Sequence, residues 1–546
     1  MIFLRAECKL SAALAVLPVL IWCGANAEYF SSIHEMSNVF IYEQKMLQHI
    51  QKFIADNERK LDFLRARLDE YESERSEAQQ WGIAYFESPL NKYLLSKRLT
   101  VDWQRIENLM AAATGEKPLK RLQRLRQRDN MPKPEDLTGT IDGLLRIQFI
   151  YRLQTKHLAA GILDGVAYGM QLNAKQCLEI GQQALTTKYP ELAHAWLLEA
   201  HNRLSSSDRS KLLPHILGQL VQVKATLSDS RGVNSTLEIL KELEPSSGHH
   251  HNYEVFLQAQ TQIDDLTLAN PFKEHEPVPE DLSNLSHDEI YRYTCNGYIK
   301  KTPPEERNLR CGYMSETHPF LLLAPLKVEE LNRNPLLVLY HDVIYQSEID
   351  VLNKLNRKRY ERAGVVINST STVSKKRTSQ HIFIAATRHK VLRTIDQRVA
   401  DMTNLNMQYA EDHQLADYGI GGHYSQHFDW FAESKSFYAN LQSDLANSKC
   451  DEMGNRIATV LFYLSDVAQG GGTAFPILKQ LLKPKKYAAA FWYNLHASGK
   501  GDWRNLHGGC PIIVGSKWVL NRWIREYDQS DLRPCDLWDD SVFNTS

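Results

Sequence analysis

A histidine and an aspartate in the C-terminal half have the types and the spacing that could bind a metal ion. The stretch YSQHFDW places His427 two residues before Asp429. On an extended strand the two side chains share one face, with Cα atoms about 7 Å apart, so an imidazole nitrogen and a carboxylate oxygen can reach the same ion. An isolated pair of this kind is common by chance, and a strand with two polar residues facing water fits it equally well.

A third candidate ligand follows later in the chain. The stretch WRNLHGGCPIIVGSKWVLNRWIRE carries His507 ahead of a predicted strand and Lys517 ten residues further on. Two histidines and one carboxylate form the facial triad that leaves positions of Fe(II) open for a bidentate substrate and O2. A lysine buried in a β-barrel is costly unless it pairs with an anion. The C5 carboxylate of 2-oxoglutarate would be such an anion.

Short strands are the elements that must position these residues. Runs that are β-branched or aromatic and bounded by turn residues are NPLLVLYHDVI, HIFIAAT, RIATVLFYLSD, AAAFWYNL and KWVLNRWIREY. Strands that recur with glycine-containing connections suggest a β-sandwich or jelly roll. We therefore expect a metal-binding domain over 335–530 with a double-stranded β-helix (jelly-roll) fold, followed by a C-terminal tail over 531–546.

A helical pattern dominates the N-terminal half. Apolar residues recur every seven residues in two registers, three residues apart: Leu47, Ile54, Leu61 and Leu68, then Ile50, Leu64 and Tyr71. Four heptads with charged flanks predict a coiled-coil seam. We therefore expect a helical dimerisation domain with a coiled coil over 28–160. The alternative is an amphipathic helix that packs on its own domain.

A second helical region and a linker complete the organisation. Between residues 165 and 265, paired helical segments resemble a tetratricopeptide-type module, whose stacked helices leave a concave groove for an extended peptide. The residues after Asn270 are rich in proline and acidic side chains, which predicts a linker region over 266–334. The chain is thus expected to be multidomain, with a helical N-terminal half and a mostly β C-terminal half.

The first residues indicate the cellular compartment. A short basic region, an apolar run that ends at Cys23 and a small-residue cleavage site that ends at Ala27 predict a secretory signal peptide over 1–27. No later segment is long and apolar enough to span a bilayer. A formal net charge of −1 over 546 residues gives no overall basic field for nucleic acid or an anionic membrane.

The cysteines and the glycosylation sequons fit a secretory compartment. The chain has eight cysteines, two of them within the predicted signal peptide, and none of the others has CxxC spacing, which argues against a zinc ribbon. Disulfides are the default in an oxidising compartment. The pairs closest in sequence are Cys295 with Cys311 and Cys510 with Cys535, although sequence alone cannot fix the connectivity. Sequons for N-glycosylation occur at Asn234, Asn284, Asn368 and Asn544.

The ordered set of motifs resembles a known family. The stretches YGIGGHYSQHFDW, GNRIATVLFYLSDVAQGGGTAFP and AAAFWYNLHASGKGDWRNLHGGCPIIVGSKWVLNRWIRE resemble the catalytic domain of prolyl 4-hydroxylase α subunits, within the 2-oxoglutarate and Fe(II)-dependent dioxygenases. The front half resembles the same subunits in SPLNKYLLSKRLTVDW, PEDLTGTIDGLLRIQFIY and LNAKQCLEIGQQA. The resemblance covers essentially the whole chain after the predicted signal peptide.

The resemblance implies roles for individual residues. The implied iron ligands are His427, Asp429 and His507. The implied partner of the 2-oxoglutarate C5 carboxylate is Lys517, assisted by the hydroxyl of Tyr418, with Thr459 near the same pocket. The family's two intrachain disulfides correspond to Cys295 with Cys311 and Cys510 with Cys535. Cys177 is then free, and Cys450 has no counterpart.

The resemblance also implies a reaction and its partners. The reaction is 4-hydroxylation of peptidyl proline, coupled to oxidative decarboxylation of 2-oxoglutarate to succinate and CO2, with Fe(II), O2 and L-ascorbate. The implied assembly is an α2β2 tetramer in the endoplasmic reticulum lumen, with protein disulfide isomerase as the β subunit. Leucines, histidines and a tryptophan stand where family members carry tyrosines that stack on a polyproline II peptide, so collagen and other proline-rich substrates both stay open. A peptidyl lysyl hydroxylase and a non-catalytic peptide-binding or assembly subunit are the alternatives.

Overall fold

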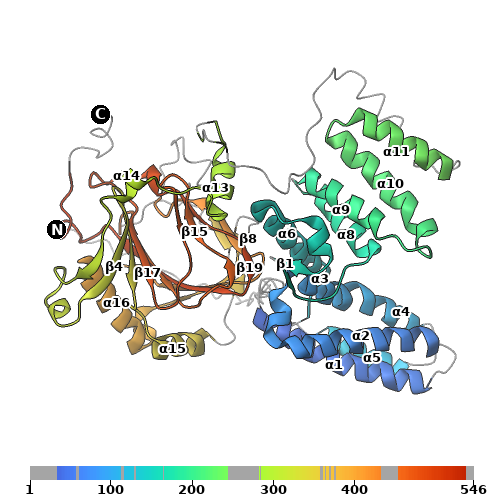
Figure 1. The fold of residues 1–546 in the computed structure, drawn as a ribbon. Coiled ribbons are helices and arrows are strands. Elements are labelled where there is room, and N and C mark those ends of the chain that lie inside the picture. Colours follow the sequence, from blue (N-terminus) through green and yellow to red (C-terminus); the bar gives the residue numbers. More distant parts are fainter. Residues whose placement is uncertain are drawn as a thin grey trace, which may run out of the picture.

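The computed structural model has a helical half and a sheet-rich half that lie side by side (Figure 1). It describes residues 33–56, 61–111, 116–127, 131–163, 165–187, 189–243, 279, 282, 284–356, 361–362, 364–367, 370–373, 377–431 and 453–536. The predicted signal peptide over 1–27, Cys450, Asn368 and Asn544 lie outside these residues. Among the described residues no helix is both long and apolar enough to cross a membrane.

The helical half begins with a bundle. Its elements are α1 (Ile33–Asp56), α2 (Leu61–Trp81), η3 (Gly82–Glu87), α3 (Pro89–Lys97), η4 (Arg98–Asp102), α4 (Trp103–Ala111), α5 (Glu116–Arg126), α6 (Pro134–Tyr151) and α7 (Thr155–Ala159). Local signals set the helix starts. Ser88 caps α3 by accepting a hydrogen bond from the backbone N–H of Asn91, and Pro134 occupies the first turn of α6, where its missing N–H costs nothing.

The predicted coiled-coil helix is a hairpin within one chain. The first helix ends at Asp56 and the second begins at Leu61, and the Gln51 side chain donates a hydrogen bond to Glu72 across the hairpin. Most seam positions that the structure describes are buried in the chain's own core, with Leu47, Ile50, Ile54, Leu64 and Tyr71 below 9% exposed. The structure therefore supports the alternative of helices packed on their own domain, while self-association stays a prediction.

Leu64 tests this core directly. Its side chain is fully buried, so we expect Leu64→Ala to lower the free energy of unfolding of the helical half by about 2 to 5 kcal/mol, because it leaves a cavity. Urea denaturation of the full chain, followed by its helical signal, measures this change. The neighbouring Phe63 is 47% exposed, and Phe63→Ala is the matched control, with an expected change within about 0.5 kcal/mol. Equal effects of the two substitutions would contradict the hairpin core.

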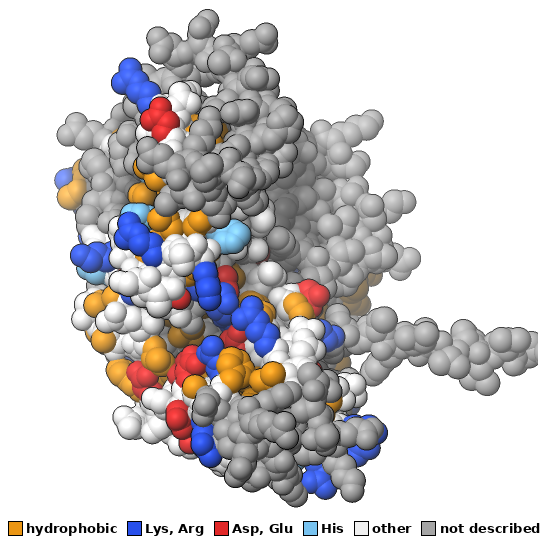
Figure 2. Space-filling model, turned by 90° about the vertical axis from the view of Figure 1, so that its right-hand side faces the viewer, with side chains coloured by type: hydrophobic (Ala, Val, Ile, Leu, Met, Phe, Trp, Pro, Cys, Tyr) orange, Lys and Arg blue, Asp and Glu red, His pale blue; other side chains and the backbone are white. Residues whose placement is uncertain are grey.

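A second set of helices extends the helical half. These elements are β1 (Ile162–Leu163), β2 (Val166–Ala167), α8 (Ala174–Leu185), α9 (Pro190–Asn202), α10 (Arg209–Thr226) and α11 (Ser230–Leu243), with each helix packed against the next. Trp196 of α9 is fully buried and donates a hydrogen bond to the Gln148 side chain at 2.7 Å, so this tryptophan belongs to the core. The tetratricopeptide-like assignment stays a prediction. On the face in Figure 2, basic and acidic side chains are interspersed with apolar ones.

Two sheets face each other in the C-terminal half. The larger sheet has the strand order β3 (Cys311–Met314), β4 (Leu326–Arg333), β5 (Leu336–His341), β17 (Ala489–Tyr493), β13 (Arg456–Tyr463), β20 (Lys517–Arg525), β11 (His413–Tyr418), β10 (Gln380–Ile384) and β6 (Glu361–Arg362). The smaller sheet has the order β16 (Gln480–Leu482), β15 (Thr473–Phe475), β18 (His507–Gly509), β12 (His423–His427) and β9 (Arg377–Thr378). Short pairs join β14 (Gln469–Gly470) to β19 (Ile512–Val514) and β7 (Gly364–Ile367) to β8 (Thr370–Val373).

The two large sheets enclose one apolar core. Phe475 from the smaller sheet packs with Tyr463 and Trp492 from the larger sheet. The other face of the larger sheet is covered by α15 (Gln346–Asn356) and α16 (Lys390–Thr403). Two facing antiparallel sheets agree with the expected jelly roll.

The region predicted as a linker contains ordered elements. It includes α13 (His287–Cys295), α14 (Pro303–Glu306) and η5 (Pro319–Leu322), together with β3 and β4. Because β3 and β4 continue the larger sheet beyond β5, the sheet domain begins before residue 335. Proline and acidic residues suggested a linker there, but β4 pairs along its whole length and this pairing outweighs the local composition.

Candidate active site

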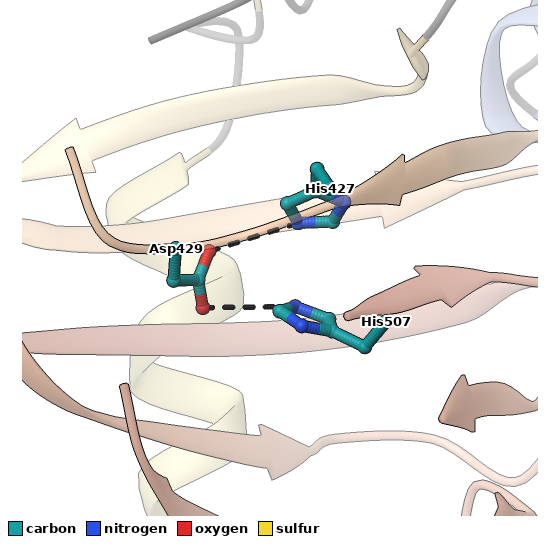
Figure 3. A group of neighbouring side chains, drawn as sticks. All are labelled: His427, Asp429 and His507. Carbon is teal, nitrogen blue, oxygen red and sulfur yellow. Dashed lines mark ion pairs between the residues drawn. The ribbon is translucent and has the colours of Figure 1, made fainter. Parts of the chain in front are cut away.

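The three candidate ligands meet at the mouth of the jelly roll. His427 ends β12 and His507 begins β18, and the two residues lie opposite each other in the antiparallel pairing of these strands. The Asp429 carboxylate lies between the two imidazole rings, with oxygens 3.6 Å from His427 Nε2 and 3.7 Å from His507 Nε2 (Figure 3). One ligand atom from each residue lies within 4.8 Å of the others, and all three residues are buried. The geometry fits a single small cation.

Backbone carbonyls fix the orientation of both histidines. The Nδ1 of His427 lies 2.8 Å from the carbonyl oxygen of Ser425, and the Nδ1 of His507 lies 2.9 Å from that of Asn505. Each Nδ1 donates its proton to the carbonyl, so each Nε2 keeps its lone pair and faces Asp429. A second partner of this kind is typical of metal-binding histidines. Burial, with the neighbouring His427, lowers the pKa of His507 to about 4, which leaves the ring neutral as a metal ligand must be.

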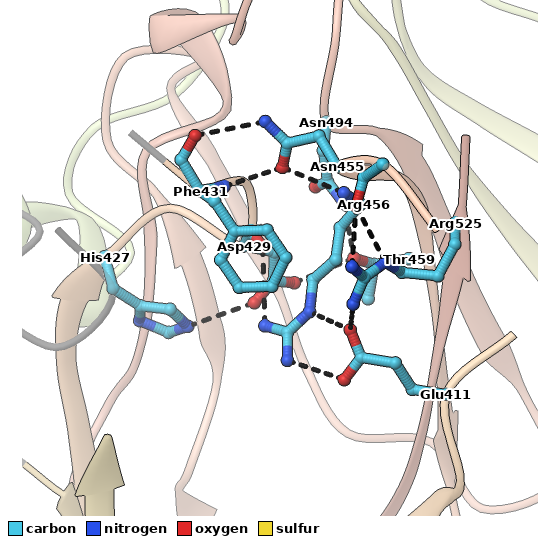
Figure 4. Close-up of polar contacts among 10 residues, drawn as sticks. Glu411, His427, Asp429, Phe431, Asn455, Arg456, Thr459, Asn494 and Arg525 are labelled. Atoms are coloured by element: carbon cyan, nitrogen blue, oxygen red, sulfur yellow. Dashed lines mark hydrogen bonds and ion pairs between the residues drawn. The ribbon is translucent and has the colours of Figure 1, made fainter. Parts of the chain in front are cut away.

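Asp429 is held by a relay of side-chain hydrogen bonds. The Thr459 hydroxyl donates to an Asp429 oxygen at 2.8 Å, and the Asn494 amide donates to that hydroxyl at 2.9 Å (Figure 4). Since Thr459 accepts from Asn494, its own proton is left for the carboxylate. Burial alone would raise the pKa of Asp429, but the positive charge that His507 and His427 carry when protonated outweighs it and holds the pKa well below its usual range. The Asp429 carboxylate is therefore ionised, with its oxygens directed toward the two Nε2 atoms.

An ion-pair network supports the backbone beside Asp429. Arg456 Nε and Nη2 donate to the Glu411 carboxylate at 2.6 and 2.7 Å, and Arg456 Nη1 donates to the Asp429 carbonyl at 3.4 Å (Figure 4). Arg525 donates to the same Glu411 at 3.0 Å. The partly buried Glu411 carboxylate is the shared counterion of both arginines, so the two guanidinium groups can lie in the interior. It anchors the chain on the far side of the metal site.

Thr459 gives a test of the relay. We expect Thr459→Val to weaken the binding of Co(II) or Mn(II) by about 10-fold to 100-fold, because partners of metal ligands carry effects of that size. Thr459→Ser keeps the donor and is expected to bind almost as tightly as the parent. Isothermal titration of the metal-free protein measures both. Equal affinities of the valine variant and the parent would show that the hydroxyl is not needed.

Lys517 lies in the same cavity as the triad. This cavity is lined by residues that include Tyr418, Tyr424, Trp492 and Asn521, together with the three candidate ligands. Lys517 is 5% exposed, and its Nζ donates to the Thr473 hydroxyl at 3.1 Å. Burial lowers the pKa of Lys517 to about 7. A buried lysine ammonium in the lining of this cavity is suited to binding an anion.

The structure places the predicted site residues in and around one cavity. Tyr418 lines the cavity beside Lys517, as β11 and β20 pair these two residues directly. Thr459 was expected near the same pocket; its hydroxyl contacts Asp429, which lines the cavity, and a role toward the cosubstrate stays a prediction. The hydroxyl beside Lys517 belongs to Thr473, which the sequence analysis missed. Its place at the start of a strand after the GGG turn was the available signal.

The disulfide pairing differs from both sequence-based expectations. Cys295 is bonded to Cys510, with Cα atoms 5.7 Å apart, while Cys311 and Cys535 are free and exposed. The pairings of Cys295 with Cys311 and of Cys510 with Cys535 are therefore wrong for this structure. The physical reason is that α13 packs against β15, next to β18, and this brings its last residue, Cys295, to Cys510. Proximity in sequence was a poor guide to proximity in the fold.

The other modification and cysteine predictions fall on surface and core positions. Cys177 is free and buried, as expected, and burial raises the pKa of its thiol to about 12. Asn234 on α11 and Asn284 are both exposed. Their glycosylation stays a prediction.

Comparison with known proteins gives matches in both halves of the chain. Residues 32–165 match the family described as prolyl 4-hydroxylase alpha-subunit, N-terminal region, and residues 413–525 match the 2OG-Fe(II) oxygenase superfamily. Prolyl 4-hydroxylase subunit alpha-2 of Caenorhabditis elegans is 33% identical, over 96% of this chain and 96% of that relative. Prolyl 4-hydroxylase subunit alpha-1 of Rattus norvegicus is 30% identical, over 94% of this chain and 97% of that relative. A solved viral collagen prolyl hydroxylase of Paramecium Bursaria Chlorella virus-1 is 25% identical, over 35% of this chain and 95% of that one, with a TM-score of 0.27.

Proposed function

Because the chain belongs to the family of prolyl 4-hydroxylase alpha subunits, we propose that His427, Asp429 and His507 hold the Fe(II) with which it hydroxylates peptidyl proline. The enzyme is a proline hydroxylase that depends on Fe(II), 2-oxoglutarate and O2. The observation that carries the residue assignment is the convergence of the two Nε2 atoms on the Asp429 carboxylate.

The donor set fits Fe(II). Two neutral imidazoles and one ionised carboxylate are the ligands of the facial triad, and this set leaves coordination positions for a chelating cosubstrate and O2. The Nδ1 atoms are already engaged by carbonyls, so the free Nε2 atoms have the metal as their remaining partner. Bound Fe(II) with 2-oxoglutarate and O2 supplies the oxidant that inserts one oxygen atom at proline C4, with succinate and CO2 as the other products.

The protein's own groups bind and orient the cosubstrate. We assign the C5 carboxylate of 2-oxoglutarate to Lys517 and to the hydroxyl of Thr473, which both line the cavity and lie 3.1 Å apart. Tyr418 lies beside Lys517 and is available as a second hydroxyl donor. Because the triad and Lys517 line one cavity, a single 2-oxoglutarate can reach both with its two ends. Trp492 and Phe475 pack against the His507 ring and keep water from that side of the metal site.

The substrate is a proline-containing peptide or protein. The relatives are named as prolyl 4-hydroxylase subunits, which supports proline as the reacting residue. We propose that α8 to α11 bind the peptide away from the site of hydroxylation. Trp196 is in the core and takes no part in this binding. Turnover of collagen-type peptides compared with turnover of other proline-rich peptides decides between these two substrate classes.

The assembly and compartment are further proposals. The relatives are named as alpha subunits, which supports an assembly with a second kind of subunit. We propose protein disulfide isomerase as that β subunit, in an α2β2 tetramer in the endoplasmic reticulum lumen. The signal-peptide pattern of residues 1–27 and the four sequons support that compartment. L-ascorbate is proposed as the reductant that restores Fe(II) after uncoupled turnover.

One assay tests the proposed function. Formation of succinate from 2-oxoglutarate is measured with proline-containing peptides and with lysine-containing peptides, and mass spectrometry locates the added oxygen. We expect one oxygen at proline C4, with succinate and hydroxyproline formed in equal amounts. Oxygen on lysine would show a lysyl hydroxylase, and peptide binding without turnover would show a non-catalytic subunit.

A further inference from the structure

Two chain segments behind the active site are joined to each other. The loop 419–422 links Tyr418 to the strand that ends at His427, and the segment 510–514 follows the strand that begins at His507. The Gly421 N–H donates to the Ile512 carbonyl at 2.9 Å, and the Ile512 N–H donates to the Gly422 carbonyl at 3.2 Å. A shift of either segment is thus passed to the other.

Helix α6 of the helical half packs on both segments, and in Figure 1 it lies beside β19. Arg146 donates to the Gly421 carbonyl at 2.6 Å, and the Tyr151 hydroxyl donates to the Pro511 carbonyl at 2.6 Å. Close approach requires glycine at position 421, because a Cβ on Gly421 would lie 2.8 Å from the Cα of Gly143. Gly421 also has a φ of +73°, which disfavours any other residue.

The contact between the two halves is a shared core. Val514, at the end of β19, is 1% exposed and belongs to the apolar core of the helical half. At the C-terminal end of α6, the Ile150 carbonyl accepts a hydrogen bond from Asn296 at 2.6 Å. Asn296 follows Cys295, which is bonded to Cys510 in the second segment. The helix is therefore tied to the second segment both directly and through Cys295.

We infer that Arg146 and Tyr151 are positioning residues for the metal site, supplied by the helical half. This inference rests on the proposed function, because it assigns them to the same triad. Each fixes a carbonyl only a few residues from a histidine: Gly421 lies six residues before His427, and Pro511 lies four residues after His507. Displacement of reacting groups by about 1 Å can cost about 100-fold in rate, so such supports matter.

The test is metal binding by the purified full-length protein, measured as Co(II) or Mn(II) titration without 2-oxoglutarate or peptide. The variants are Arg146→Met, Arg146→Lys and Tyr151→Phe, each with its melting temperature. We expect Arg146→Met to weaken metal binding by about 10-fold, the lower end of the range for residues bonded directly to a metal ligand, because Arg146 acts through the backbone. Tyr151→Phe, which removes one oxygen atom, is expected to weaken it by about 10-fold. Arg146→Lys keeps a cationic donor and is expected to recover part of the loss.

Controls separate positioning from general stability. Thr138 lies on the same helix but is exposed and donates its hydrogen bond to the Glu135 carbonyl within that helix, so Thr138→Ala is expected to leave metal affinity unchanged. Unchanged metal affinity in both Arg146→Met and Tyr151→Phe, with or without a lower melting temperature, would overturn the inference. If Arg146→Met does not fold, Tyr151→Phe alone decides. Failure of the proposed function is seen separately, as a His427→Ala variant that binds metal as tightly as the parent.

Discussion

His427→Ala and Asp429→Ala are each expected to abolish succinate formation and proline hydroxylation. Each substitution removes one of only three protein ligands of the proposed Fe(II) site. Partners that merely orient a ligand are worth about 10-fold to 100-fold, so loss of a ligand itself should exceed about 100-fold. His427 lies at the end of its strand, and its removal opens space at the cavity mouth, so we expect the fold to persist.

The measurement combines activity, metal content and folding. Turnover is followed with saturating 2-oxoglutarate and peptide, metal affinity by titration, and folding by circular dichroism. Thr459→Ser is a useful control, because it changes the same site but keeps every metal ligand and donor. Near-normal turnover by His427→Ala or Asp429→Ala would remove the metal assignment.

The triad was predictable because the residue types and their local spacing indicate a metal site. His427 and Asp429 are two apart on an extended segment, so they share a face in any strand. His507 could be added because a facial triad needs a second histidine, and Lys517 because a lysine among apolar strand residues needs an anion. These inferences depend on residue types more than on tertiary structure.

The rest of the site depends on contacts that spacing does not encode. Thr459 and Thr473 are both strand threonines, and only the register of the sheets decides which of them faces Asp429 and which faces Lys517. The bond of Cys295 to Cys510 spans 215 residues and depends on how α13 packs. The contact of Arg146 with Gly421 spans 275 residues, and nothing in the periodicity of α6 indicates it.

The heptad pattern predicted which helix faces are buried but not what they pack against. Apolar residues at seven-residue spacing identified the buried faces of α1 and α2 correctly. The same spacing fits a seam between two chains and a hairpin within one chain, because both bury one stripe of each helix. In the described residues, the end of α1 at Asp56, the bond between Gln51 and Glu72 and the burial of the stripe in the chain's own core favour the hairpin.

Lys517→Ala is expected to raise the KM for 2-oxoglutarate by about two to three orders of magnitude. If the ammonium pairs with the C5 carboxylate in the buried cavity, the substitution leaves that carboxylate without its countercharge. A broken buried pair costs about 3 to 5 kcal/mol, at about 1.4 kcal/mol per factor of ten in affinity. Metal affinity should change little, because Lys517 is not among the grouped ligands.

The pH dependence of the same constant gives a second signature. Burial holds the pKa of Lys517 at about 7 in the ligand-free protein, below its usual range, so the ammonium is present below pH 7 and lost above it. The form competent to bind the carboxylate then falls about tenfold between pH 6 and pH 8, and the KM for 2-oxoglutarate should rise by about the same factor. Lys517→Arg stays protonated throughout, so its KM should be flat across this range.

The Lys517→Arg variant also separates charge from shape. Its planar guanidinium is larger than an ammonium and cannot keep the same contact with Thr473, so it should recover only part of the affinity that Lys517→Ala loses. The experiment is a 2-oxoglutarate titration at saturating Fe(II) and peptide, for the parent and both variants, at pH 6 and pH 8. Equal KM values for all three proteins would sink the assignment of Lys517. A large loss in Lys517→Ala that Lys517→Arg partly restores, together with a pH dependence of the parent KM that the arginine variant lacks, would establish a charge pair, because a purely steric role predicts no pH dependence in any of the three proteins.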